Sequence, residues 1–318
     1  MAPKERKFVR FAVFVLIFNL AVIAWGAFVR HSFSGDGCGS HWPLCNGEVF
    51  PANPTTATII EFAHRTTSFL ALVFVVALLV IAIRTFPKGH GARIAAWLAL
   101  TFTLVSAAIG ALLVVFGWVG KDDSMGRAIT LSMHLINTML LLGALIHIIW
   151  WGAGRPRVPL GGQGVTGWIV VVGSLAVLFV GMSGAVTSLG DTIYPRDSSL
   201  QVISEGLSPT GHFLLRLRLW HPLIAVGSAF VLYFSVLVLS QVCERREVRS
   251  FGRDVLILVA AQLLLGLASV WLKAPTLLAI LHLLLADALW IVVIRLWLSA
   301  LESPKRRLAT SDPLPAEG

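Results

Sequence analysis

The sequence predicts an all-α integral membrane protein whose eight transmembrane helices form two duplicated four-helix bundles. The composition, the number of apolar stretches and an internal repeat support this prediction. Of the 318 residues, 57% are hydrophobic and only 13% are charged, and the mean hydropathy is +0.83. A water-facing surface normally needs about 25% charged residues. The composition therefore excludes a soluble globular protein.

Eight stretches with almost no charge are each long enough to cross about 30 Å of hydrocarbon as a helix, at about 1.5 Å per residue. They cover residues 11–29, 62–83, 94–118, 128–151, 168–189, 219–240, 255–272 and 276–298. The first stretch is too long for the core of a signal peptide and lacks a clear small-x-small cleavage site. We therefore expect it to be retained as a helix.

Basic residues gather at one end of alternate stretches and predict the orientation. They precede the first stretch and follow the second, fourth, sixth and eighth. By the positive-inside rule this side faces the cytoplasm, so a bacterial-type cell membrane protein with both termini inside is expected. Anionic lipid headgroups suffice as partners for the net charge of +9, and no nucleic-acid partner is expected. The basic residues on the predicted cytoplasmic side are Lys4, Arg6, Lys7, Arg10, Arg84, Lys88, Arg93, Arg155, Arg157, Arg245, Arg246, Arg249, Arg253, Lys305, Arg306 and Arg307.

Two long loops, residues 30–60 and 190–218, lie on the outer side. Cys38 and Cys45 are both in the first of them, whereas Cys243 is alone at the inner side. Because thiols pair in oxidising compartments, we expect a disulfide between Cys38 and Cys45. A structural staple for this glycine-rich loop and a redox-active pair both remain open.

The two halves of the chain repeat one another. An even number of helices in each half gives both halves the same direction in the membrane, with the repeat axis along its normal. We predict domains of residues 1–158 and 159–318, joined by a Gly/Pro-rich linker over 152–167. Matching positions lie 156 to 158 residues apart, except for the last pair, which lies 148 apart because the outer loop before it is shorter: Gly26 and Gly184, His64 and His221, Gly110 and Gly266, and then His134 and His282.

Four histidines share one depth, within about two helical turns of the outer ends of the even-numbered stretches. A lone intramembrane histidine is often a packing residue, but four at one depth in repeated helices favour ligation. A zinc site would also need carboxylate or thiolate ligands. Two histidines that face each other across a bundle instead suit axial ligation of haem iron. The four are His64, His134, His221 and His282.

Glu61 distinguishes the two halves. It precedes His64 by three residues and so shares its helix face, whereas Arg218 stands at the matching position of the second half. An acid beside only one histidine pair suggests that the first site carries out chemistry and that the second stores or relays electrons. Two structural interpretations are open: a helix-entry carboxylate favoured by the helix dipole, or an ion-pair partner of Arg65.

The first half also carries specific motifs, namely Gly26-Ala27-Phe28-Val29-Arg30, Gly35-Asp36-Gly37-Cys38, Trp42-Pro43-Leu44-Cys45-Asn46-Gly47 and Glu61-Phe62-Ala63-His64-Arg65. With these motifs the chain resembles haem A synthase, the membrane oxygenase that converts haem O to haem A for terminal oxidases. The resemblance covers essentially the whole chain. The second half departs from the pattern, because Pro222 follows His221 where an arginine is common, and its outer loop lacks the cysteine pair that some members carry.

The resemblance implies that His64 and His134 bind the substrate haem O and that His221 and His282 hold a haem b. The C8 methyl of haem O would be oxidised to a formyl group by successive hydroxylations. Glu61 would shuttle protons or stabilise developing positive charge. An unidentified electron donor is implied, and haem O synthase or oxidase assembly factors are candidate partners. Four arginines near the outer surface are candidate propionate partners, although snorkelling also accounts for them: Arg30, Arg65, Arg216 and Arg218.

Two functions of other classes would use the same histidines. A quinol-oxidising cytochrome b would keep both haems six-coordinate and would not need Glu61. A haem transporter or assembly chaperone would have the same ligands without turnover. Haem extraction separates them, because only the enzyme yields haem A or a hydroxylated intermediate.

Overall fold

The computed structural model describes residues 1–156, 158, 161–195 and 204–302. Within these residues the secondary structure is helical apart from one isolated bridge between Cys45 and Glu48. Eight helical spans are long and apolar enough to cross a membrane. The chain is therefore a multi-pass membrane protein, and the predicted fold class is confirmed. The helices are α1 (Pro3–His31), α2 (Thr56–Thr85), α3 (Gly91–Val115), α4 (Met125–Gly152), α5 (Gly164–Ile193), α7 (Phe213–Arg218), α8 (Trp220–Val242), α9 (Arg246–Trp271) and α10 (Thr276–Leu301).

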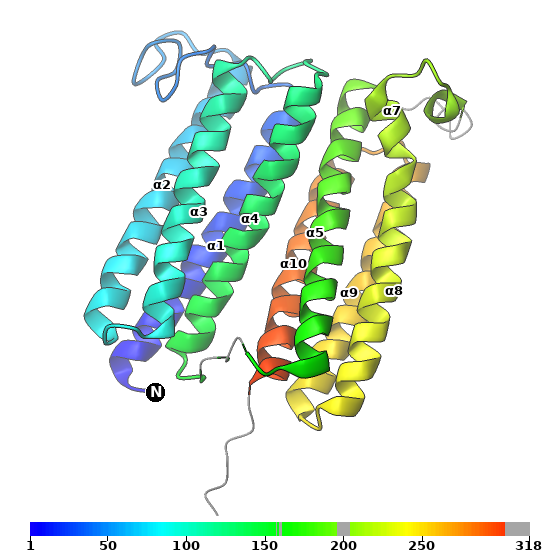
Figure 1. Ribbon diagram of the computed structural model, residues 1–318. Helices are drawn as coiled ribbons and strands as arrows, with labels where there is room; N and C mark the ends of the chain where they lie inside the picture. Colours follow the sequence, from blue (N-terminus) through cyan, green and yellow to red (C-terminus); the bar gives the residue numbers. More distant parts are fainter. Residues whose placement is uncertain (157, 159–160, 196–203, 303–318) are drawn as a thin grey trace, which may run out of the picture.

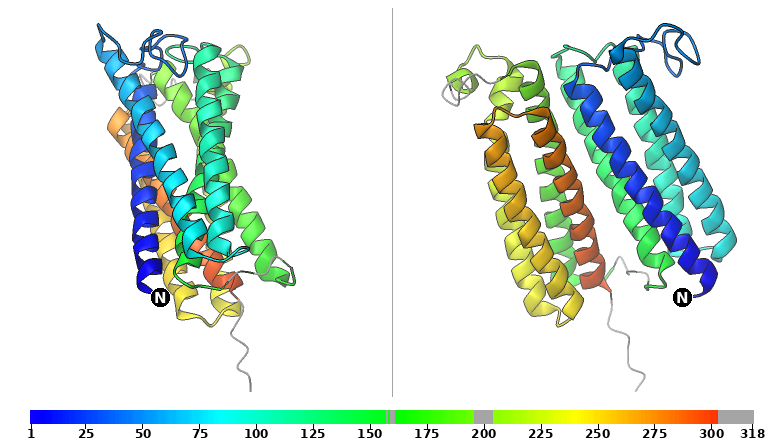
Figure 2. Two further views of the ribbon diagram at one scale, coloured as in Figure 1. Left: turned by 90° about the vertical axis from the view of Figure 1, so that its left-hand side faces the viewer. Right: turned by 180° about the vertical axis from the view of Figure 1, so that it is seen from behind.

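The long helices form two groups of four that stand side by side (Figure 1). In the first group α1 and α3 each pack against both α2 and α4; in the second, α5 and α9 each pack against both α8 and α10. Seen from behind, α1 and α10 face each other where the two groups meet (Figure 2). This pattern gives each group the same internal arrangement, while the duplication itself stays a prediction.

The helices extend beyond the apolar stretches because polar caps, and not hydropathy, set their ends. Thr55 caps α2, where its hydroxyl accepts the Thr58 N–H at 3.2 Å, so α2 begins six residues before the predicted start. The prediction for α3 was three residues too long at its outer end. There Gly117 adopts a left-handed conformation, with φ +68°, and the Trp118 N–H bonds the Leu113 carbonyl. This closing motif ends the helix at Val115.

The sixth span is interrupted at Leu219, between α7 and α8. Pro222 accounts for the break, because a proline has no N–H to bond the carbonyl four residues earlier, and its ring crowds that carbonyl. The carbonyl belongs to Arg218, the last residue of α7. The two helices nevertheless continue as one span of 30 residues, Phe213–Val242.

The two ends of the molecule differ in charge. The N-terminus, the α2–α3 loop and the α8–α9 loop lie at one end, and the loop with Cys38 and Cys45 lies at the other with α7 (Figure 1). The predicted alternation of basic loops therefore matches the helix directions for the described residues. Arg157, Lys305, Arg306 and Arg307 lie outside them, and so does residue 159, where the predicted second domain begins.

An ion-pair network joins the two groups at this basic end. Arg155, just after α4, bonds Glu247 of α9 at 3.1 and 2.5 Å and Glu302 beyond α10 at 2.9 Å. Arg245 bonds the same Glu302 carboxylate at 2.8 Å. The two carboxylates raise the pKa of the Arg155 guanidinium. One guanidinium thus holds three segments from both groups together.

The apolar core is continuous across the boundary between the groups. Trp290 of α10, which is 3% exposed, donates its indole N–H to the Met139 carbonyl of α4 at 2.6 Å. Large apolar side chains on the outward faces are exposed instead, such as Phe69 and Leu264. In a membrane protein such faces contact lipid, where apolar side chains need no cover.

We expect Trp290→Phe to lower the free energy of unfolding by about 1 kcal/mol or more, because it removes a buried hydrogen bond between the groups. Thermal unfolding of the purified chain in detergent measures this. Trp271→Phe is the matched control, because Trp271 is 75% exposed and its loss leaves the core intact. Equal unfolding midpoints for both variants would contradict the role of this contact.

Candidate haem sites

The four histidines lie at one level along their spans. His64 and His221 each lie eight residues after the first residue of their spans, His134 lies nine after and His282 six after. At about 1.5 Å per residue these offsets correspond to depths of roughly 9 to 14 Å. His64 and His134 are also within electrostatic range of each other.

Three of the four imidazole rings lie against a glycine of the neighbouring helix. A Cβ at Gly26 would be 2.9 Å from Cε1 of His64, and one at Gly184 would be 3.2 Å from Cε1 of His221. The Gly26–His64 contact of the first group therefore recurs as Gly184–His221 in the second. A Cβ at Gly266 would lie 3.3 Å from Cε1 of His282. Any side chain at these positions would push the ring away, so the glycines set where the histidines stand.

The hydrogen bonding of the rings leaves one nitrogen available. In His64, His134 and His282 the Nδ1 atom is buried without a hydrogen-bond partner. Their Nε2 atoms are neither buried in this way nor hydrogen-bonded, so they remain accessible. Nε2 is a common histidine ligand atom for iron and other metals. The described residues contain no cluster of three or more His, Cys, Asp or Glu that could hold a metal ion. Histidines offered in pairs fit haem and do not fit a three- or four-ligand zinc site.

Among the four histidines, His221 is the one whose Nδ1 is hydrogen-bonded to a side chain. Its Nδ1 lies 2.9 Å from the Ser183 hydroxyl of α5. At the matching position of the first half stands Trp25, whose indole N–H bonds the Ile60 carbonyl at 3.1 Å. A comparison of residues 25 and 183 across the repeat would have revealed this difference. A hydrogen-bond partner such as Ser183 fixes the orientation of a ligating histidine ring and raises the basicity of that ring.

Glu61 is buried, at 4% exposed, and both of its oxygens are hydrogen-bonded. One accepts the Cys38 backbone N–H at 2.7 Å, and the other accepts Arg65 Nε at 3.0 Å and Nη2 at 2.5 Å. Arg65 in turn donates to the His41 and Leu44 carbonyls at 2.6 and 2.5 Å. Glu61 therefore forms the ion pair with Arg65 that was one of its two structural interpretations. Its carboxylate also links the helix that carries His64 to the outer loop.

The loop itself is closed and docked on α2. Cys38 and Cys45 form the expected disulfide. A Cβ at Gly37 would be 2.4 Å from the Ala57 backbone, and the Gly37 carbonyl accepts the Thr58 hydroxyl at 2.9 Å. The disulfide is thus part of a lid attached to the outer end of the helix that carries His64.

Ion pairs and hydrogen bonds of Arg218 stabilise the outer end of the second half, whereas a disulfide stabilises the outer loop of the first half. Arg218, 3% exposed, bonds Asp191 and the Tyr194 carbonyl, each at 3.2 Å, and lies 3.8 Å from Glu205. The Tyr194 hydroxyl donates to Asp123 of the first half, which raises the pKa of Tyr194 to about 12. These contacts hold the described part of the second outer loop, which has no cysteine pair.

The four candidate propionate partners have different surroundings. Arg65 and Arg218 are already engaged by carboxylates, and Arg216 is exposed. Arg30 donates to the Ser188 hydroxyl of α5 at 2.6 Å. The neighbouring His31, to which the sequence assigned no site role, approaches Ser188 at 3.3 Å and Thr192 at 3.1 Å. This polar contact between the groups was missed because it depends on how the two groups are placed.

Comparison with known proteins identifies the family. A family model described as cytochrome oxidase assembly protein, COX15-CtaA, matches residues 9–294. The chain belongs to the COX15-CtaA family. This result confirms the resemblance to haem A synthase on which the expectations above depended.

Individual relatives carry two different names. The chain is 45% identical over 310 residues to a protoheme IX farnesyltransferase of Thermus thermophilus, covering 98% of this chain and 51% of the relative. It is 27% identical over 293 residues to a heme A synthase of Alkalihalophilus pseudofirmus, covering 88% of this chain and 93% of the relative. A heme A synthase of Exiguobacterium sibiricum is 34% identical over 142 residues, with 45% and 47% covered. The chain thus spans about half the length of the Thermus relative.

We expect Gly26→Ala to reduce haem binding in the first half about tenfold or more, because the new Cβ displaces the His64 ring. Gly143→Ala is the matched control: it also lies in the first group, and the only atom near a Cβ there is Trp290 Nε1 at 3.8 Å, an ordinary contact. Bound haem per protein, measured by pyridine haemochrome spectra, gives the result. Equal haem content in the two variants would contradict the assignment of His64 as a ligand.

Proposed function

We propose that this COX15-CtaA family member is a haem A synthase, which oxidises the C8 methyl of haem O to a formyl group by successive hydroxylations. The observation that carries the proposal is that each group has two histidines at one depth, while Glu61, a buried carboxylate, precedes His64 by one helical turn. The heme A synthase relatives support it, since one of them aligns over most of its length with this chain.

The two sites have different tasks in this proposal. His64 and His134 bind haem O, and His221 and His282 hold a haem b. The hydrogen bond between His221 Nδ1 and the Ser183 hydroxyl supports a permanently ligated haem in the second half. In the first half neither His64 nor His134 has a partner at Nδ1, which suits a substrate that must enter and leave, whereas in the second half only His282 lacks one. When bound, haem b supplies electrons that come from a donor outside this chain.

In this proposal, residues of the first half surround the substrate and supply the proton, positioning and propionate-binding groups. Glu61 holds a proton or a negative charge close to the His64 face, and Arg65 keeps its carboxylate in place. The disulfide lid over this end of α2 limits the access of water to the ring substituent. Arg30, the cation at the boundary of the groups, is the propionate partner favoured here, because its Nε is buried without a partner and its guanidinium bonds a hydroxyl where that of Arg218 is engaged by a carboxylate.

The basic end of the molecule faces the cytoplasm in this proposal, so both termini lie inside and the haem sites lie in the outer leaflet. Haem O synthase or oxidase assembly factors would meet the protein there or within the membrane. The name of the Thermus relative describes a protein of which this chain matches only half. We therefore assign farnesyl transfer to that protein and not to this chain.

His221→Ala and His282→Ala should each lower tightly bound haem b, because each removes one of two axial ligands. His64→Ala should spare haem b and abolish the conversion of haem O. Haem b is quantified from reduced-minus-oxidised spectra, and haem A is quantified after extraction. If both second-half variants keep their full haem b, the division of tasks is wrong.

Glu61→Gln should keep haem binding and reduce the conversion rate by about 10² or more, the usual effect of losing a general acid or base. The glutamine oxygen still accepts the Cys38 N–H, so the lid stays docked. Arg65→Gln is the control, because it frees the His41 and Leu44 carbonyls but retains the carboxyl group. A near-normal haem A yield from Glu61→Gln would leave Glu61 as a loop anchor only.

A further inference from the structure

A groove of about 470 Å³ lies between the inner ends of α1 and α2. Three cations form its rim at the surface end of the helices: Lys4 and Lys7 of α1 and Arg84 of α2. All three are exposed, and no ion pair within the described part of the chain involves them. Its apolar floor includes Phe11 and Ile81.

The charges and the floor are arranged along the membrane normal. Phe11 lies four residues beyond Lys7, and Ile81 lies three residues before Arg84. Each apolar side chain is therefore about one helical turn, or roughly 5 Å, deeper in the membrane than its cation. A ligand that fits this groove has an anionic head at the surface and a hydrocarbon chain directly below.

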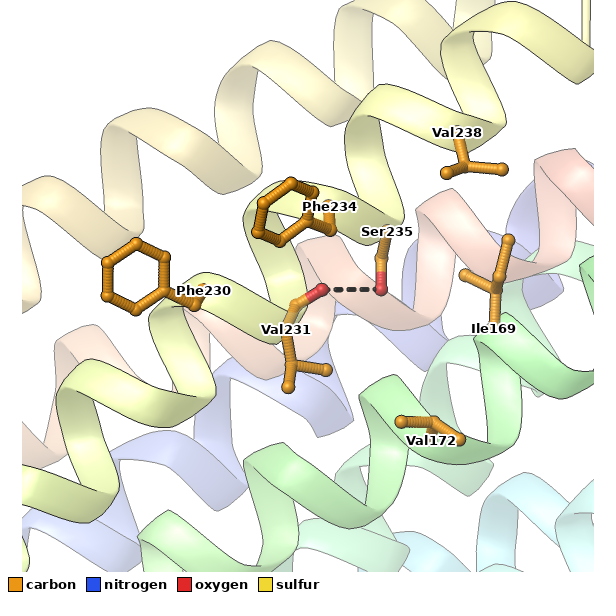
Figure 3. A pocket seen from close by; sticks show the side chains of 7 residues that line it. All are labelled: Ile169, Val172, Phe230, Val231, Phe234, Ser235 and Val238. Atoms are coloured by element: carbon orange, nitrogen blue, oxygen red, sulfur yellow. Dashed lines mark hydrogen bonds between the residues drawn. The ribbon is translucent and has the colours of Figure 1, made fainter.

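The second group has a groove at the matching place, between α5 and α8, with a volume of about 340 Å³. Ile169 and Val238 line it (Figure 3), and they stand 158 and 157 residues after Phe11 and Ile81. At the offsets of Lys7 and Arg84 stand Val165 and Gln241, one helical turn from Ile169 and Val238 toward the surface and outside the lining of this groove. Cations therefore line the α1–α2 groove and are missing from the lining of the α5–α8 groove.

We propose that the α1–α2 groove is a binding site for one anionic phospholipid of the inner leaflet. Lys4, Lys7 and Arg84 bind the phosphate, and an acyl chain lies on Phe11 and Ile81. The α5–α8 groove accepts an acyl chain without regard to its headgroup. Basic residues at the cytoplasmic surface attract anionic lipid, and three convergent cations above an apolar groove make that attraction local.

The test uses the full chain in nanodiscs of phosphatidylcholine, with phosphatidylglycerol added and bound lipid counted by native mass spectrometry. Replacing Lys4, Lys7 and Arg84 together with glutamine should weaken phosphatidylglycerol binding about a hundredfold, at about fivefold for each cation. The matched control replaces Lys88, Arg246 and Arg249, which are exposed residues at the same end of the molecule. This control should keep the bound lipid.

A gain of binding provides a second, independent test. Val165→Lys combined with Gln241→Arg should create a second phosphatidylglycerol site at the α5–α8 groove. This second test does not depend on whether the triple glutamine variant folds. An equal loss in the control triple variant would overturn the proposal in favour of diffuse surface charge. Displacement of the lipid by inorganic phosphate would also overturn it, since the site would then recognise a free anion. Failure of the gain variant to bind more lipid would show that the rim cations do not select the headgroup.

Discussion

The need to satisfy polar groups where no water is available governs this structure. The helices bond their own backbone groups, and several polar side chains at membrane depth are tied to partners, as in Glu61 with Arg65 and the Trp290 indole with a carbonyl of α4. Other buried polar atoms have no partner, among them Asp287 Oδ2 and the Trp297 indole nitrogen. Three of the histidines belong to this second set, because each buries an unpaired Nδ1 and leaves Nε2 accessible. In the proposed function the iron of a bound haem would give those rings the fixed role that the protein alone does not.

The two groups of helices share a plan and differ in details that separate their tasks. Gly26 and Gly184 lie against the rings of His64 and His221 in the same way. The first group adds Glu61 and a disulfide lid, whereas the second adds Ser183 behind its histidine and secures its outer end through Arg218. The lipid grooves follow the same pattern, with cations in only one of them.

The sequence predicted what depends on local pattern and missed what depends on packing. Composition and apolar length gave eight spans, because a bilayer imposes them on any chain. The Cys38–Cys45 pair followed from two thiols in one outer loop. The end of α3 was missed because Gly117, not hydropathy, closes that helix. The Arg30–Ser188 and Ser183–His221 bonds could not be predicted, because they join helices whose relative placement no sequence pattern specifies.

The central claim is that two histidine pairs divide substrate oxidation from electron storage within one chain. The most direct test identifies the haems extracted from the full chain after expression with and without a supply of haem O. The account predicts haem B under both conditions and haem A, with hydroxylated intermediates, only when haem O is supplied. Recovery of unmodified haem O beside haem B, with no oxidised product, would contradict it and would support a carrier or an electron-transfer cytochrome.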